Sequence, residues 1–271
     1  MRNHKQQEQM YLNCHTYYSL RYGTIKPEQL LAIASENGLQ TLALTDINNT
    51  SACLDFVRLS SKYKIKPVLG VDFRNGAQQQ FILIAKNNNG YKNINDYLSK
   101  FLHDSELKIP EIAPELDDVF VIYPYIHKKT YHLKEHEFLG IKPKDLNHLK
   151  FSKWNAFRNK LVVLQTVSFQ NKKDFNTHRL LRAIDNNTLL SKLSKSEQGQ
   201  ETDRMLPYQE LCDTYREFPE LIKNTASILD KCHSDFDFSH ENPNNPHSYI
   251  QNEALDFRLF RKLAYAGLHY R

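Results

Sequence analysis

The stretch YLNCHTYYSLRYG, Tyr11–Gly23, is a short apolar run that ends in a histidine and continues into a polar turn rich in tyrosine. A short apolar run bounded by a turn predicts a buried strand. Histidine is the commonest metal ligand in proteins and also binds anions, so a histidine at a strand end suits a metal or phosphate site. The stretch therefore raises the question whether His15 is part of such a site.

Six further runs along the chain are short and rich in Val, Ile, Leu, Phe or Tyr. Runs of this kind predict strands buried on both faces, as in a parallel sheet. They are TLALTD (41–46), KPVLGVDF (66–73), QQFILIAK (79–86), DVFVIYPY (118–125), HEFLGI (136–141) and KLVVLQTV (160–167).

Helical patterns lie between several of these runs, at residues 27–38, 52–64 and 90–102. The first begins at Pro27 and ends at Gly38, which is the usual asymmetry of helix ends. Alternating strands and helices indicate βαβ units, so we expect an α/β fold, a distorted seven-stranded (β/α)7 barrel. The gap at residues 74–78 is too short for a crossover helix, so we expect its two flanking strands to pair as a hairpin.

After residue 172 the pattern becomes helical. We expect a disordered tail over 1–9, an α/β barrel over 10–172 and a helical extension over 173–271. The polar segment 194–204 predicts a mobile loop, and the Pro- and Asn-rich segment 237–249 predicts a linker. Because the chain stops inside a helical pattern, we expect it to be a piece of a longer protein.

The chain has 271 residues, of which 40% are hydrophobic, and a formal net charge of +5. This composition is that of a folded globular protein, and the basic excess is too small to indicate a nucleic-acid partner alone. No apolar run approaches the ~20 residues of a membrane-spanning helix. The cysteines do not form a C-x-x-C motif, which favours reduced thiols in a cytoplasmic protein; they are Cys14, Cys53, Cys212 and Cys232.

The first three predicted strands end in His15, Asp46 and Asp72. In parallel α/β barrels the carboxyl ends of the strands meet at one mouth, so these three side chains are candidate ligands of zinc, manganese or iron. Such an ion would activate water for attack on phosphate esters. A structural interpretation stands beside this one, because an aspartate after a strand often caps the following turn or helix.

Two weaker patterns involve histidine and tyrosine. His132 and His136 are four residues apart, as on one face of a helix, but surface histidines at this spacing are usually solvated. Four tyrosines of the opening stretch suit base stacking, although aromatic side chains more often pack in the core. They are Tyr11, Tyr17, Tyr18 and Tyr22.

Several longer stretches, taken together in their order, resemble the N-terminal PHP (polymerase and histidinol phosphatase) domain of the bacterial replicative polymerase family, DNA polymerase III alpha subunit. The resemblance covers nearly the whole chain. The stretches are NCHTYYSLRYG (13–23), ALTDINNTSACLDFVRLSSKYKIKPVLGVDF (43–73), FILIAKNNNGYKNIN (81–95), FPELIKNTASILDKC (218–232) and AYAGLHYR (264–271).

The resemblance implies a seven-stranded distorted barrel whose cleft holds a cluster of metal ions through His, Asp and Glu ligands. Carried over by motif, only three ligands are retained here: His15, Asp46 and Asp72. Neutral residues stand at other expected ligand positions. The first histidine of H-x-H-[ST] is Asn13, the acid before the glycine is Tyr22, the histidine of T-D-H is Ile47 and the histidine at the head of the next strand is Gln80; the last motif offers Gln165, Thr166 and Ser168.

The resemblance therefore implies a PHP module with a degenerate metal site, whose parent is a DNA-directed DNA polymerase, a nucleotidyltransferase of DNA replication. We expect a structural and docking role. The partners would be the remainder of the alpha subunit, a proofreading exonuclease subunit and, through the parent, DNA. Three ligands would hold at most one weakly bound divalent ion. Two alternatives stay open: an active metal-dependent phosphoesterase or 3′–5′ exonuclease, and a nucleic-acid-binding module.

Overall fold

The computed structural model describes residues 10–104, 106–125, 132–239, 249–250 and 252–268. The predicted tail over 1–9 and most of the predicted linker over 237–249 lie outside these residues. The contacts divide the chain into two compact units, Met1–Phe236 and Asp237–Arg271, which are described separately.

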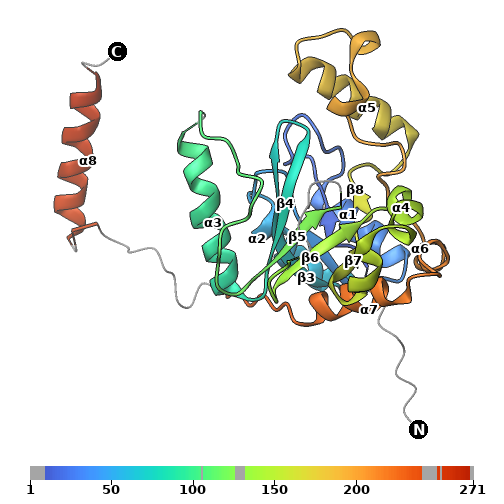
Figure 1. Ribbon diagram of the computed structural model, residues 1–271. Helices are drawn as coiled ribbons and strands as arrows, with labels where there is room; N and C mark the ends of the chain where they lie inside the picture. Colours follow the sequence, from blue (N-terminus) through green and yellow to red (C-terminus); the bar gives the residue numbers. More distant parts are fainter. Residues whose placement is uncertain (1–9, 105, 126–131, 240–248, 251, 269–271) are drawn as a thin grey trace. The chain divides into compact units, whose positions relative to one another are not determined.

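The first unit contains a curled sheet in an α/β arrangement (Figure 1). Its strand segments are β1 (Asn13–Cys14), β2 (Thr41–Leu44), β3 (Lys66–Asn75), β4 (Gln78–Ala85), β5 (Val119–Pro124), β6 (Glu137–Ile141), β7 (Leu161–Val163) and β8 (Thr166–Val167). Strands β2 to β7 form a six-stranded sheet in chain order, and β1 pairs with β8 in parallel. The backbone N–H of Thr45 donates to the carbonyl of Cys14 at 2.9 Å, which places β1 beside β2.

The predicted hairpin between the third and fourth strands is confirmed, because β3 and β4 pair antiparallel across a turn at Gly76. The pairing of β4 with β5 is also antiparallel, which the sequence pattern did not indicate. The connection between them contains α3 (Asn88–His103), and its two ends are close together, since the backbone N–H of Lys86 donates to the carbonyl of Asp118 at 2.8 Å. The side-chain amide of Asn89, at the start of α3, donates to Asp118 just before β5 at 3.0 Å.

The run predicted as one strand over 160–167 is divided. The described residues thus contain eight strand segments rather than seven. The break lies at Leu164 and Gln165, between β7 and β8. At this break, the side-chain amide of Gln165 donates to the carbonyls of Thr202 and Arg204, at 2.8 and 3.0 Å.

Helices cover the sheet and follow the predicted ranges closely at 27–38, 52–64 and 90–102. They are α1 (Pro27–Glu36), α2 (Cys53–Ser60), α3, α4 (Leu146–Lys150), α5 (Lys172–Asp185), α6 (Tyr208–Thr214) and α7 (Pro219–Asp230). Short 3-10 turns complete the unit: η1 (Ser61–Tyr63), η2 (Pro143–Asp145), η3 (Lys153–Lys160), η4 (Leu190–Lys192) and η5 (Lys195–Glu197).

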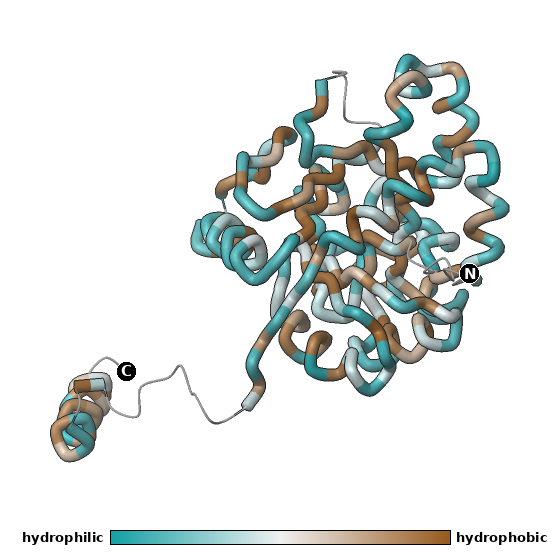
Figure 2. The backbone as a smooth tube through the Cα atoms, turned by 90° about the horizontal axis from the view of Figure 1, so that it is seen from below, coloured by the Kyte–Doolittle hydropathy of each residue, from teal (hydrophilic) through white to brown (hydrophobic). Residues whose placement is uncertain are grey.

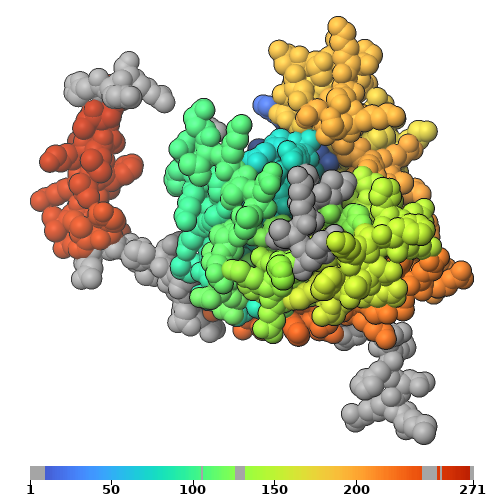
Figure 3. All heavy atoms as spheres, viewed as in Figure 1, coloured from blue at the N-terminus to red at the C-terminus, as the bar shows by residue number. Residues whose placement is uncertain are grey.

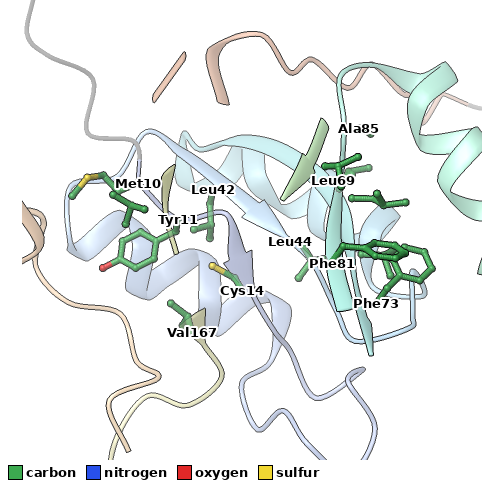
Figure 4. Packing of buried hydrophobic residues seen from close by; sticks show 14 of the residues in the cluster. Met10, Tyr11, Cys14, Leu42, Leu44, Leu69, Phe73, Phe81, Ala85 and Val167 are labelled. Atoms are coloured by element: carbon green, nitrogen blue, oxygen red, sulfur yellow. The ribbon is translucent and has the colours of Figure 1, made fainter. Parts of the chain in front are cut away.

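Two apolar clusters form the core of this unit. The larger one joins side chains of the strands to α1, α2 and α3; Figure 4 shows Phe73 and Phe81 meeting across the hairpin, with ring centroids 5.2 Å apart. The smaller one joins alternate strand residues to Ile228 and Leu229 near the end of α7. The hydrophobic segments, brown in Figure 2, accordingly gather in the middle of the unit.

The second unit contains α8 (Glu253–Leu268). Large apolar side chains of this helix are exposed, among them Phe257 at 65% and Phe260 at 69%. No helix among the described residues has the length and apolar character that crossing a membrane requires.

Candidate functional site

The carboxyl ends of β1 and β8 and the outer half of β3 bring two of the three candidate ligands together. His15 follows β1 directly, and Asp72 lies in β3. The Nε2 atom of His15 is 3.0 Å from Oδ2 of Asp72, and both side chains are completely buried. His15 and Asp72 thus meet as expected, although Asp72 lies within β3, which continues to Asn75, and not at its end.

The other ring nitrogen of His15 contacts Ser168, just after β8. Nδ1 lies 2.8 Å from the Ser168 hydroxyl oxygen, and Ser168 is completely buried as well. Burial lowers the pKa of His15, against the pull of its hydrogen bond to Asp72, so the ring is neutral. The Nε2–H then donates to the carboxylate, and the Ser168 hydroxyl donates to Nδ1.

Asp72 is neutralised by an arginine of the same strand. The Nη2 and Nε of Arg74 donate to Oδ2 of Asp72 at 2.6 and 3.0 Å, and the Arg74 side chain is only 5% exposed. The side-chain amide of Gln79, which pairs with Arg74 across the hairpin, donates to the same oxygen at 2.8 Å. Burial alone would raise the pKa of the Asp72 carboxyl, but the positive charge of Arg74 and the hydrogen bonds from His15 and Arg74 together outweigh burial and hold that pKa well below its usual range.

The carbonyl of Asp46 accepts from the backbone N–H of Asp72 at 3.2 Å, but the Asp46 carboxylate points to other donors and holds a loop. Its carboxylate accepts hydrogen bonds from the backbone N–H of Thr16 at 2.6 Å, the Thr16 hydroxyl at 2.7 Å and the Ser19 hydroxyl at 2.6 Å. Burial raises the pKa of Asp46 above its ordinary value, against these hydrogen bonds. A hydrogen bond between His15 and Asp46 across the cleft would stabilise these two retained residues without a metal ion. The structure instead pairs His15 with Asp72.

The expected ligand positions with neutral residues are occupied by side chains with other contacts. Asn13 donates to the Thr166 hydroxyl at 3.2 Å. The backbone N–H of Ile47 donates to the Ser19 hydroxyl at 2.9 Å. Gln80 turns away and donates to the carbonyl of Gln78 at 3.2 Å, so its neighbour Gln79, and not Gln80, is the glutamine beside Asp72.

Tyr22, at the position of the expected acid, lies between two cations. The guanidinium of Arg74 is 4.9 Å from its ring centroid and that of Arg182 is 5.7 Å away. The rings of His15 and His178 meet it edge-on at 5.9 and 4.5 Å. Tyr22 is 6% exposed, and burial raises the pKa of its phenol. An aromatic face stabilises a desolvated guanidinium, so Tyr22 supports the cation that neutralises Asp72.

Sequence reasoning did not identify Arg74, Gln79 or His178. Arg74 and Asp72 are two residues apart on one strand, so their side chains share a face, and this spacing was a usable signal for an ion pair. His178 lies in the middle of a helix and its partners are far away in sequence, so no local pattern marks it. Its Nδ1–H donates to the carbonyl of Tyr22, and its Nε2 accepts from the backbone N–H of Gly199, both at 2.8 Å.

A cleft of about 630 Å³ opens beside this cluster, lined by residues of the β3–β4 hairpin, η2 and the segment 195–200. Arg74 and Gln79 lie in its wall, whereas His15, Asp72 and Ser168 do not. Figure 3 shows the gold residues of α5 and the following turns beside the teal residues of the hairpin. The segment predicted to be a mobile loop over 194–204 is fixed in this wall by its hydrogen bonds to His178 and Gln165.

The Asp72–His15–Ser168 arrangement contains the residue types of a hydrolytic triad, but its geometry does not suit nucleophilic catalysis. All three side chains are fully buried, so no substrate reaches the hydroxyl.

The cluster does not fit the metal ions that the resemblance implies. Within the described part of the chain, no group of three or more His, Cys, Asp and Glu side chains could hold a metal ion. Oδ2 of Asp72 already accepts four N–H contacts, from His15, Gln79 and twice from Arg74. A metal ion there would face a guanidinium of like charge.

The two weaker patterns have structural explanations. His132 and His136 lie outside any helix, so they do not share a helix face. Tyr11 and Tyr22 are buried and Tyr18 packs partly against the core, whereas Tyr17 is 44% exposed. The core-packing interpretation of the tyrosines is therefore confirmed for all of them except Tyr17.

Residues 12–142 match the PHP domain. The chain is 23% identical over 266 residues to the DNA polymerase III subunit alpha of Buchnera aphidicola subsp. Schizaphis graminum, which covers 83% of this chain and 23% of the relative. It is 27% identical over 179 residues to that of Ureaplasma parvum, covering 66% of this chain and 16% of the relative. The chain thus spans about a quarter or less of these relatives. The resemblance to the alpha-subunit PHP domain is confirmed at low identity.

Among solved structures, the chain is similar to a putative metal-dependent phosphoesterase from Bifidobacterium adolescentis. The two are 12% identical with a TM-score of 0.30, over 78% of this chain and 95% of the other.

Proposed function

Taking the similarity of residues 12–142 to the PHP domain as the premise, we propose that this chain is the PHP module of a DNA polymerase III alpha subunit and acts as a scaffold. In this proposal, residues 10–172 are the barrel and 173–271 lead towards a polymerase palm. The parent would carry out template-directed DNA synthesis in the cytoplasm. The module would support the remainder of the alpha subunit and offer a docking surface to a proofreading exonuclease subunit.

One observation carries the scaffold role: the two candidate ligands that meet, His15 and Asp72, are completely buried, and both ring nitrogens of His15 and Oδ2 of Asp72 are engaged in contacts within the protein. A phosphoesterase needs an open position on a metal ion or an exposed nucleophile. Here the retained carboxylate is occupied by Arg74, and the hydroxyl nearest the imidazole is 0% exposed. These contacts support a cluster that holds strand ends together and performs no hydrolysis.

Hydrolysis is tested with the purified chain, prepared without chelator, on a phosphodiester substrate and on a single-stranded oligonucleotide in the presence of manganese or zinc. We expect no turnover above that of a His15→Ala variant. Turnover that is abolished by His15→Ala would overturn the scaffold role and favour the phosphoesterase or exonuclease alternative.

Docking is tested by mixing the chain with the separately produced palm-containing remainder of the same alpha subunit. Co-elution in size-exclusion chromatography is expected, and independent elution at micromolar concentration contradicts the proposal. Primer extension is expected only in the presence of the remainder. The nucleic-acid-binding alternative predicts DNA affinity that falls steeply with salt. We expect no such binding near physiological ionic strength.

A further inference from the structure

We infer that Arg74 serves as a built-in cation at this site, taking the place of a divalent metal ion on Asp72 and barring one from binding. The inference rests on the proposed scaffold function and deepens it, because it names the group that keeps the strand ends together without a metal.

The charge of the buried Asp72 carboxylate is balanced by Arg74. A buried carboxylate requires a cation or several donors, because a lone charge in a protein interior is very costly. Arg74 supplies both, through two N–H contacts at 2.6 and 3.0 Å to one oxygen. The Asp72–Arg74 ion pair carries no net charge, and the neutral His15 adds none. A divalent ion added beside it would leave an uncompensated charge of +2 in a buried cluster.

The guanidinium of Arg74 is held in place by its neighbours. Arg74 lies at a shift in the β3–β4 register, opposite Gln79, and its plane is supported by the ring of Tyr22 at 4.9 Å. Tyr22 and Gln79 are neutral, and each contacts a member of the ion pair. Arg74 thus packs against an aromatic face, and Oδ2 of Asp72 accepts one more N–H donor, from Gln79. Both features favour a guanidinium over a metal ion, since an amide N–H and an aromatic face are not ligands for zinc or manganese.

The acceptor atoms around Arg74 that it does not contact also bear on metal binding. Oδ1 of Asp72 and Oε1 of Gln79 are buried and have no hydrogen-bond partner. Together with Nε2 of His15, they are the atoms nearest to a metal-ligand set in this cluster. Removing the guanidinium and replacing Gln79 with histidine would therefore leave two imidazoles beside the Asp72 carboxylate, a ligand set typical of zinc sites.

The experiment compares four proteins: the parent chain, Gln79→His, Arg74→Ala/Gln79→His and the matched control Arg182→Ala/Gln79→His. Arg182 is a second buried arginine beside Tyr22, but its acidic partners are Asp185 and Glu197 and it makes no contact with Asp72. Each protein is dialysed against zinc and then against metal-free buffer. Zinc content and the zinc-induced change in Tm are measured.

We expect about one zinc per chain, and a rise in Tm of roughly 5 °C or more on adding zinc, only for Arg74→Ala/Gln79→His. The other three proteins should retain no zinc. Zinc retained by the parent chain would overturn the inference, and so would a folded Arg74→Ala/Gln79→His variant that retains none. Failure of the scaffold function is distinguishable, because it appears as hydrolysis or absent docking while these zinc contents stay as expected.

A folding defect in the double variant has its own readout. Its soluble yield is compared after expression with and without added zinc, and a yield that depends on zinc supports the inference. Arg74→Ala alone is also heated with 10 mM methylguanidinium, which can enter from the cleft that Arg74 lines. We expect its Tm to rise relative to the same concentration of sodium, with no such rise for Arg182→Ala. Absence of both effects would count against the inference.

Discussion

The imidazole of His178 accepts a hydrogen bond from the backbone N–H of Gly199 at 2.8 Å and so fastens the segment over the cleft to α5. The same ring donates from Nδ1 to the carbonyl of Tyr22 at 2.8 Å. The Gly199 contact requires the neutral ring, because a protonated ring has no acceptor nitrogen. Protonation of one buried side chain would therefore release a wall of the cleft.

We predict that stability falls as the pH drops from about 6.5 to about 4. Burial, with smaller contributions from the charges of Arg182 and Arg74, lowers the pKa of His178 to about 4. The unfolded chain therefore binds more protons than the folded one in this window, and stability is lost as the pH falls through it. The full effect of His178 is about 3 kcal/mol, at 1.36 kcal/mol per pKa unit.

Urea unfolding of the parent chain and of His178→Gln at several pH values measures this effect. His15 is also neutral and buried, and contributes with the same sign, so the difference between the two proteins isolates His178. The His178→Gln protein should show a flatter dependence between pH 4 and 6.5. Parallel curves for the two proteins would show that His178 does not titrate there.

We predict that Asp46→Ala destabilises the fold by about 2–4 kcal/mol without any effect through metal. The carboxylate satisfies the Thr16 N–H and two buried hydroxyls, and buried donors left without acceptors are costly. Asp46→Asn retains one acceptor oxygen and should lose less. Denaturant unfolding in buffers with and without chelator measures both variants. A loss that appears only without chelator would identify Asp46 as a metal ligand.

The alternation of strands and helices could be predicted from the sequence because buried runs and amphipathic helices are local patterns. α1 starts at Pro27 as expected, and the gap around Gly76 indicated the β3–β4 hairpin. The partners of His15 could not be predicted, because Asp72 and Ser168 lie 57 and 153 residues away in the sequence. The motifs identified the positions where ligands are missing. They did not identify Arg74, whose guanidinium contacts the retained Asp72, because Arg74 lies outside the motifs.

We predict that Gly23→Ala strongly destabilises the first unit, by about 3 kcal/mol or more. A Cβ at this position would lie 1.9 Å from the carbonyl oxygen of Thr16, which is backbone and cannot rotate away. The displaced loop is the one that Asp46 caps. Gly267→Ala is a suitable control, because a Cβ there meets nothing within 4 Å and alanine favours a helix. Similar Tm values for both variants would contradict this interpretation of the loop.

A buried threonine attaches α7 to the sheet. The hydroxyl of Thr225 accepts from the backbone N–H of Val163 in β7 at 2.8 Å and donates to the carbonyl of Leu221 at 2.7 Å. Thr225→Val keeps the shape but leaves the Val163 N–H without an acceptor, so we expect a loss of about 1–3 kcal/mol. Thr225→Ser keeps the hydroxyl and loses one methyl group, so it should lose clearly less, at about 1 kcal/mol.

Amide hydrogen exchange at Val163 reports the same contact directly. In Thr225→Val its exchange should accelerate more than that of Leu161 or Val162, since their amides do not depend on the hydroxyl. Equal acceleration along β7 would mean that the threonine acts through packing alone. Ile228 and Leu229 of α7 also belong to the smaller apolar cluster. The Thr225 hydroxyl is thus one of the contacts that join the helical segment after residue 172 to the sheet.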